Sequence, residues 1–276
     1  MRRNFISSLL LVSLMAAFIA AFNAKVVESK ILKKGLVIYY SFDKDTVKKG
    51  EVKDLSGNGN DGVLKTKNLE VVKGKVKEGM EFPGTAIDYI AVKNHHYKAA
   101  DIEGITLAAW IKVSTRSMIA SWDRSEFFRF TAGDDQLGNM TYIAFDTCCG
   151  IHDWHGKTKV TDGKWHHVLA LFDGKARKKK IYVDGKLDAE TDAPHAKMGK
   201  AITRYGFIGI GSEAGAFDGG TGPTGFPFNG IMDEFVLYDR GLTEKECKEI
   251  YEAKGFKDIA PAGKLSLTWG EVKASR

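Results

Sequence analysis

The sequence predicts an all-β fold: a two-sheet antiparallel jelly-roll sandwich with one short C-terminal helix. Short apolar and β-branched runs recur between Gly, Asn and Asp turns through most of the 276 residues, with almost no helical periodicity. The chain is 43% hydrophobic, with 30 glycines and only 5 prolines, which suits one sizeable core and many turns. Strands in this number favour a large jelly roll over βαβ units.

The first 24 residues differ from the rest of the chain. Arg2 and Arg3 precede an apolar stretch from Ile6 to Phe22, a pattern typical of secretory signal peptides. We therefore expect residues 1–24 to be a signal peptide and the protein to be exported, whether secreted, periplasmic or at the cell surface. The alternative is an uncleaved membrane anchor, because the apolar stretch is close to the shortest length that spans a bilayer.

One domain follows the leader. Residues 25–34 form a polar, lysine-bearing spacer, the domain is expected at 35–255, and residues 256–276 form a C-terminal tail. The expected strands cover residues 35–42, 61–64, 79–82, 89–92, 105–113, 117–122, 127–131, 142–145, 165–172, 181–183, 206–210 and 230–238.

The run Trp165–Phe172 is the clearest strand. Both of its alternating faces are largely apolar, as expected of a central strand covered on two sides. Residues 181–183 are expected to pair back along the same sheet. His166 and His167 lie in this run, so we interpret them as hydrogen-bonded core positions and not as catalytic groups.

A helix is expected near the end of the domain. Thr243 is a suitable N-cap, and Glu246 three residues later completes a capping box. Gly255 is expected to end the helix. Cys247 lies on the apolar side of the helix, where it is interpreted as a small buried hydrophobic residue.

Net charge excludes one class of partner. The formal charge of +6 is modest and spread along the chain, with residues 175–180 as the densest basic run. This run falls at a hairpin tip, so a solvated loop is favoured over a polyanion site. Nucleic acid is therefore not an expected partner.

Several motifs occur in the order found in one known family. They are Gly35-Leu-Val-Ile-Tyr-Tyr-Ser-Phe-Asp43, Asp54-Leu-Ser-Gly-Asn-Gly-Asn-Asp-Gly62, Trp165-His-His-Val, Tyr182-Val-Asp-Gly and Phe228-Asn-Gly-Ile-Met-Asp-Glu-Phe. With these motifs the chain resembles laminin-G-like jellyroll domains of the concanavalin-A-like lectin and glucanase superfamily. The resemblance implies two antiparallel sheets, a structural calcium ion in many members and frequent carbohydrate binding, although a fold does not fix a function.

The resemblance implies a calcium site. It places Asp43 on the first strand beside Asp233 on the penultimate strand, and Asn60 and Asp61 add oxygen atoms from a polar turn. Calcium takes about six to eight oxygen ligands, so these four residues are the predicted ligands of a structural Ca²⁺. The alternative is ordinary turn chemistry, because Asn and Asp also cap turns without metal.

The segment Cys148-Cys149-Gly-Ile-His152-Asp-Trp154-His155 is the most distinctive local feature. Two thiols and two imidazoles suggest zinc, but adjacent cysteines rarely both reach one tetrahedral ion. Export also favours oxidation, so a disulfide between Cys148 and Cys149 is the favoured interpretation. Unpaired, reduced cysteines remain the other alternative.

A carbohydrate surface is expected around this segment. Aromatic faces stack on sugar C–H surfaces, and neighbouring polar groups bind the hydroxyls. The alternative is that the two tryptophans belong to the core or its rim. The predicted sugar-binding residues are Trp122, Asp123, Arg124, His152, Trp154 and His155.

Enzyme activity is not expected. Retaining glucanases of the superfamily carry Glu-x-Asp-x-x-Glu on one strand, and here only Glu190-Thr-Asp192 begins that pattern, which ends at His195. Asn139-Met-Thr141 fits an N-glycosylation sequon. The predicted function is therefore an exported, non-catalytic domain that binds carbohydrate or glycoconjugate. The alternative is an adhesive module that recognises a surface protein, and a glycoside hydrolase is less favoured.

Overall fold

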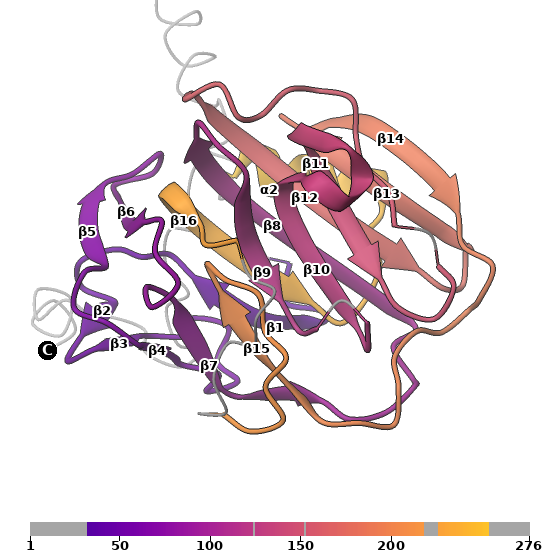
Figure 1. Ribbon diagram of the computed structural model, residues 1–276, viewed down its shortest axis with the longest axis horizontal. Coiled ribbons are helices and arrows are strands. Elements are labelled where there is room, and N and C mark those ends of the chain that lie inside the picture. Colours follow the sequence, from indigo (N-terminus) through magenta and orange to yellow (C-terminus); the bar gives the residue numbers. More distant parts are fainter. Residues whose placement is uncertain (1–31, 124, 152, 218–225, 254–276) are drawn as a thin grey trace, which may run out of the picture.

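The computed structural model describes residues 32–123, 125–151, 153–217 and 226–253. Two antiparallel sheets lie face to face as a sandwich, which confirms the predicted fold class (Figure 1). Sheet A has the order β14-β13-β12-β8-β16-β6-β5, with β1 also paired to β16. Sheet B has the order β11-β10-β9-β15-β7-β4-β3-β2.

The strands are short and joined by turns. Sheet A contains β1 (Leu36–Tyr40), β5 (Glu70–Lys73), β6 (Glu78–Pro83), β8 (Gly104–Val113), β12 (Trp165–Asp173), β13 (Lys178–Val183), β14 (Lys186–Asp192) and β16 (Asn229–Tyr238). Sheet B contains β2 (Val47–Lys48), β3 (Glu51–Val52), β4 (Gly62–Leu64), β7 (Ile90–Tyr97), β9 (Ser117–Ser121), β10 (Phe128–Asp134), β11 (Asn139–Thr147) and β15 (Arg204–Ile208). Among the described residues, the helical elements are the 3₁₀ turn η1 (Asp135–Leu137) and the α-helix α2 (Glu244–Glu252).

Strand β12 lies in the interior of sheet A, paired with β8 on one side and β13 on the other, as its apolar faces predict. Val168 and Phe172 point into the core between the sheets, and Leu169 and Leu171 belong to a second cluster on the outer face. Burial on both faces explains why this strand lacks the alternation of polar and apolar residues seen in half-exposed strands.

Helix α2 closes the outer face of sheet A. Cys247 and Ile250 of the helix pack on Leu169 and Leu171 of β12 in one buried cluster. The predicted capping box is present, because Thr243 accepts from the Glu246 N–H and the Glu246 carboxylate accepts from the Thr243 N–H. Cys247 is a buried free thiol, as its apolar position predicted.

The outer face of sheet B is also partly covered. Phe207 of β15 packs in an apolar cluster with Ile210, Ala214 and Phe217 from the loop that follows the strand. Further along the same face, the ring of Phe226 lies over a buried guanidinium on β10. With parts of both outer faces covered, the ends and edge strands of the sandwich, including β11 of sheet B, are the places where a ligand can reach side chains.

The basic hairpin tip is largely neutralised by its neighbour. Lys178 pairs with Glu190 and Asp192 of β14, and Lys180 pairs with Glu190. Lys179 between them points inward and is fully buried, where its Nζ donates to the Phe145 carbonyl at 2.6 Å. Burial lowers the pKa of Lys179 to about 7.

The expected signal peptide and C-terminal tail lie outside the described residues, as does most of the spacer. No helix among the described residues is long and apolar enough to cross a bilayer.

Candidate functional site

Three loops meet at one end of the sandwich and are joined by hydrogen bonds. The Cys148 N–H donates to the Phe127 carbonyl at 2.9 Å, and the Gly199 N–H donates to the Cys148 sulfur at 3.1 Å. Arg204 donates to the Asp123 carboxylate at 2.6 Å. We call these loops the loop rim: residues 123–127, 148–156 and 198–203, of which Arg124 and His152 lie outside the described residues.

Cys148 and Cys149 form a disulfide in the rim. The adjacent positive φ values of Cys149 (72°) and Gly150 (74°) turn the chain sharply after β11. A disulfide leaves neither sulfur as a thiolate for zinc. Among the described residues, no group of three or more His, Cys, Asp and Glu side chains could hold a metal ion.

Trp122 does not lie on a ligand surface. Its side chain is 0% exposed and packs against the rings of Tyr97 and Phe128 in the main core. The backbone of Gly206 passes so close that an added Cβ would lie 1.8 Å from the indole. The prediction that Trp122 stacks on a sugar is therefore wrong, because aromatic residues from distant strands enclose it.

Asp123 is buried as well, and its bonds are internal. Its carboxylate accepts from Arg204 and from the Ser125 N–H, and its carbonyl accepts from the Phe127 N–H at 2.7 Å. Asp123 has φ of 66°, so it forms the turn that follows β9. Asp123 therefore stabilises the shape of the loop rim, and its buried carboxylate is not exposed to a ligand.

Trp154 and His155 lie beside β11. The Phe145 N–H donates to the Trp154 carbonyl at 3.0 Å, and the Gly156 N–H donates to the Ile143 carbonyl at 2.8 Å. This pairing sets His155 opposite Ala144, on the outer face of sheet B. Trp154, one residue earlier, is half-buried and packs against the core.

Tyr142 joins this surface, although the sequence analysis missed it. Its ring lies 5.7 Å from that of His155, at an interplanar angle of 31°. The Nδ1–H of His155 donates to the Gly156 carbonyl, so Nε2 is left as an acceptor. Neither that Nε2 nor the Tyr142 hydroxyl has a partner among the described residues. Tyr142 and His155, which we call the aromatic pair, are both only partly buried.

Asp188 of β14 anchors the far side of this segment. Its carboxylate accepts from the N–H groups of Lys157 and Thr158 at 2.7 and 3.1 Å and from the Thr158 hydroxyl at 2.5 Å. Gly156 has no room for a side chain, because a Cβ would lie 2.1 Å from an Asp188 oxygen. The segment that carries the aromatic pair's histidine is therefore fixed to both sheets, which lowers the entropy cost of binding.

A buried charge cluster lies on the neighbouring strands. Arg129 of β10 donates to Asp146 of β11 at 2.5 Å and also to Asp134. Burial raises the pKa of Asp146 to about 7, although Arg129 opposes the shift. Both carboxyl groups are 0% exposed, and Phe226 lies over the guanidinium. This pair of carboxyl groups therefore lacks the access to substrate that a glycosidase requires.

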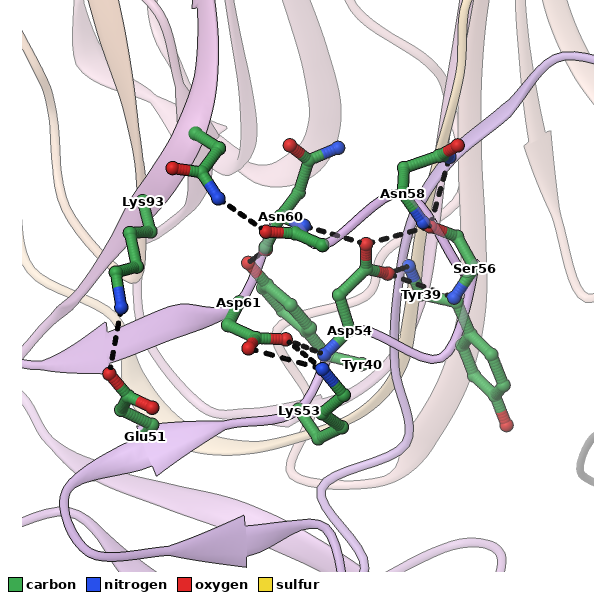
Figure 2. Close-up of polar contacts among 12 residues, drawn as sticks. Tyr39, Tyr40, Glu51, Lys53, Asp54, Ser56, Asn58, Asn60, Asp61 and Lys93 are labelled. Carbon is green, nitrogen blue, oxygen red and sulfur yellow. Dashed lines mark hydrogen bonds and ion pairs between the residues drawn. The ribbon is translucent and has the colours of Figure 1, made fainter.

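The predicted calcium ligands from the polar turn belong to a hydrogen-bond network around Asp54 (Figure 2). The Asp54 carboxylate accepts from the N–H groups of Tyr39, Ser56 and Asn60, at 2.9–3.0 Å. Asp61 accepts from Lys53 Nζ at 3.0 Å and from the Asp54 N–H. The oxygens of this turn are thus used by protein donors, as the turn-chemistry alternative predicted.

Asp43 and Asp233 both bond to residues of the turn between β5 and β6. Lys77 in this turn pairs with Asp43 at 3.0 Å, and the N–H groups of Lys75 and Val76 donate to Asp233 Oδ2 at 2.9 and 2.8 Å. Asp233 Oδ1 is buried without a hydrogen-bond partner in the described part of the chain, and burial raises the pKa of the carboxyl group to about 8. As placed here, the residues Asp43, Asn60, Asp61 and Asp233 do not fit one calcium site, because their oxygens serve two separate networks.

The glycosylation sequon is not accessible. Asn139 is buried, its Oδ1 accepts from the N–H groups of Thr141 and Tyr142, and its Nδ2 donates to the Tyr142 carbonyl. An amide with all of these bonds is a turn-forming group and is not available for glycan attachment.

A sandwich of two large antiparallel sheets is the fold of lectin-like jelly-roll domains. A family model described as the concanavalin A-like lectin/glucanases superfamily, of the laminin-G type, matches residues 84–248. The chain belongs to this superfamily.

Solved structures with the same fold include several binding domains. The binding domain of Paraclostridial Mosquitocidal Protein 1 matches with a TM-score of 0.58 and 13% identity, over 79% of this chain and 52% of that one. Domain 4 of an extracellular arabinanase from Geobacillus stearothermophilus, in complex with arabinotriose, matches with a TM-score of 0.57 and 16% identity, over 79% and 98%. The binding domain of Botulinum Neurotoxin DC in complex with SialylT matches with a TM-score of 0.56 and 12% identity, over 81% and 52%.

At these identities the resemblance shows the fold alone. Among curated proteins, a calpain-type cysteine protease from Arabidopsis thaliana is 29% identical over 113 residues, which cover 39% of this chain and 5% of the protease. The chain therefore spans about half the length of the two toxin domains and a small part of the protease.

Proposed function

We propose that this protein binds carbohydrate or glycoconjugate where β11 meets the loop rim, through the aromatic pair Tyr142 and His155 and the exposed part of Trp154. The observation that carries the proposal is the pairing of two partly exposed rings, 5.7 Å apart, on the outer side of the edge strand β11. Stacked on a sugar ring, these residues would supply apolar contact, and the Tyr142 hydroxyl and His155 Nε2 would bond its hydroxyls. Asp153, exposed in the same segment, adds an acceptor.

The structural neighbours support a sugar ligand. One was solved in complex with arabinotriose and another in complex with SialylT, on the same fold. Their low identity means that neither sugar is carried over to this chain.

We propose a non-catalytic, exported protein. The glucanase carboxylate pattern is absent from the sequence, and the carboxyl pair of Asp134 and Asp146 is buried under a guanidinium contact. The basic and apolar leader supports export.

Glycan-array and calorimetric binding measurements test the proposal. Tyr142→Ala and His155→Ala should each weaken glycan binding at least about tenfold, since aromatic contacts dominate such small sites. Tyr205→Ala is the matched control, because Tyr205 stacks on His96 at 4.8 Å in a pair outside the rim. Absence of binding to any glycan, or equal loss in the control and the rim variants, would contradict the proposal.

The second candidate is an adhesive module that recognises a protein. The full burial of Trp122 favours it, because one of the two tryptophans expected to stack on sugar is unavailable to any ligand. Binding to a cell surface that persists after enzymatic removal of its glycans would support this candidate over the first.

A further inference from the structure

Both sulfurs of the Cys148–Cys149 disulfide contact one residue of the loop 198–203, Gly199. The Gly199 N–H donates to Cys148 Sγ at 3.1 Å, and the Gly199 carbonyl oxygen lies 3.2 Å from Cys149 Sγ. Gly199 has φ of 113°, and a Cβ there would lie 2.5 Å from the Ala99 carbonyl and 3.0 Å from the Phe127 ring. The close approach of the two loops therefore depends on both the disulfide and the glycine.

The disulfide turn also sets where the binding segment begins. The Ile151 N–H donates to the Cys148 carbonyl at 3.3 Å, and the Thr147 hydroxyl donates to the Ile151 carbonyl at 3.3 Å. This turn connects β11 directly to the segment of Trp154 and His155. Cys149 holds a left-handed φ of 72°, which L-residues other than Gly, Asn and Asp rarely adopt without a constraint.

We propose that the Cys148–Cys149 disulfide is a redox-controlled clasp of the loop rim: oxidised, it holds the rim in its binding shape, and reduction by a dithiol loosens it. The regulatory part of this inference rests on the proposed glycan site, whereas the clasp itself does not. Two features of the cysteines, their exposure and their contacts with Gly199, assign the order of the reaction.

The two sulfurs differ in access and in electrostatics. Cys148 is buried and Cys149 is only partly buried, so a thiolate reaches Cys149 Sγ. Attack there forms a mixed disulfide, breaks the Cys148–Cys149 bond and leaves the electron pair on Cys148 Sγ, where the Gly199 N–H stabilises the thiolate.

The second thiol of the reductant completes the exchange. In the mixed disulfide, this second thiolate attacks the reductant sulfur that is bonded to Cys149. The attack releases Cys149 as a thiolate and the reductant as a cyclic disulfide. Both cysteines then take up protons, so the protein gains two electrons and two protons and the dithiol loses them. The new Cys149 thiol can donate to the Gly199 carbonyl, but the sulfurs must separate to van der Waals contact, so the two Gly199 contacts cannot both be kept in their present geometry.

Hydrogen exchange on the full chain with and without dithiothreitol tests the clasp. A Cys247→Ala background removes the third thiol, which is buried under α2. Alkylation followed by mass spectrometry establishes whether Cys148 and Cys149 are reduced. Exchange at the Gly199 amide should then rise at least about tenfold, while amides of β8 and β12 stay protected.

Glycan affinity of the same two samples tests the regulation. Reduction should weaken binding at least about fivefold, and the double variant Cys148→Ser, Cys149→Ser should bind like the reduced protein and ignore dithiothreitol. Resistance of the disulfide to dithiothreitol, or unchanged Gly199 exchange in fully reduced protein, would overturn the clasp. If the oxidised protein binds no glycan, the proposed function fails while the exchange result still decides the clasp.

Discussion

Asp233 makes the stability of this protein depend on pH in an unusual direction. Burial raises its pKa to about 8, so the folded protein keeps the proton up to about pH 8, whereas the unfolded chain releases it near the ordinary value of about 4. The folded state therefore binds more protons over this window, and stability falls as pH rises from about 4 to about 8. Between pH 5 and pH 8 linkage gives a loss of about 3–4 kcal/mol from this one group.

The variant Asp233→Asn isolates this contribution. Its amide oxygen can still accept from the N–H groups of Lys75 and Val76, but it carries no proton to lose. Urea unfolding should show that the stability of Asp233→Asn relative to wild type rises by about 3–4 kcal/mol between about pH 5 and pH 8. Because Asp146 titrates in both proteins, its own shift cancels in the difference. An exposed control, Asp101→Asn, should run parallel to wild type, and parallel curves for Asp233→Asn would refute the reasoning.

Three further outcomes follow from the contacts. Asp54→Ala should destabilise the fold by about 2–4 kcal/mol in urea unfolding, because three backbone N–H groups lose their acceptor, whereas Asp101→Ala should change little. Adding Ca²⁺ or a chelator should leave Tm unchanged, because Lys77 already pairs with Asp43. A rise in Tm with Ca²⁺ that Asp233→Ala abolishes would instead show that these residues bind calcium. Trp122→Ala should cost about 3–5 kcal/mol in the same unfolding assay, as a core cavity does, and a near-neutral result would place the indole outside the core.

The sequence predicted the central strands better than the edge strands. Strands β8, β12 and β16 carry long apolar runs because both of their faces are buried, and each was expected within a residue or two of its bounds. The edge strands β5 (Glu70–Lys73) and β14 (Lys186–Asp192) were missed. Their exposed, charged residues hide the alternation, as is usual for strands that must not pair with another chain.

The candidate site could be located but not resolved from the sequence. The unusual segment Cys148–His155 indicated the rim, and the disulfide found there was the favoured interpretation. The burial of Trp122 depends on Tyr97 and Phe128, which come from other strands, so no local pattern could show it. The aromatic pair depends on a loop that turns back along β11, which is likewise a long-range event.

The sequence predicted a calcium site at acidic residues whose carboxylates accept hydrogen bonds or ion pairs from the protein itself. Carboxylates grouped in turns are equally suited to Ca²⁺ and to N–H groups, and the sequence does not state which donors arrive. Here Asp54 receives N–H groups from β1 and its own turn, and Asp43 receives an ammonium from the β5–β6 turn, more than thirty positions away. Asp233 is the exception, with one oxygen satisfied and one orphaned. We therefore expect the stability of the fold to depend on pH through Asp233, and the loop rim to respond to thiol reductants. Both responses can be measured without knowing the ligand.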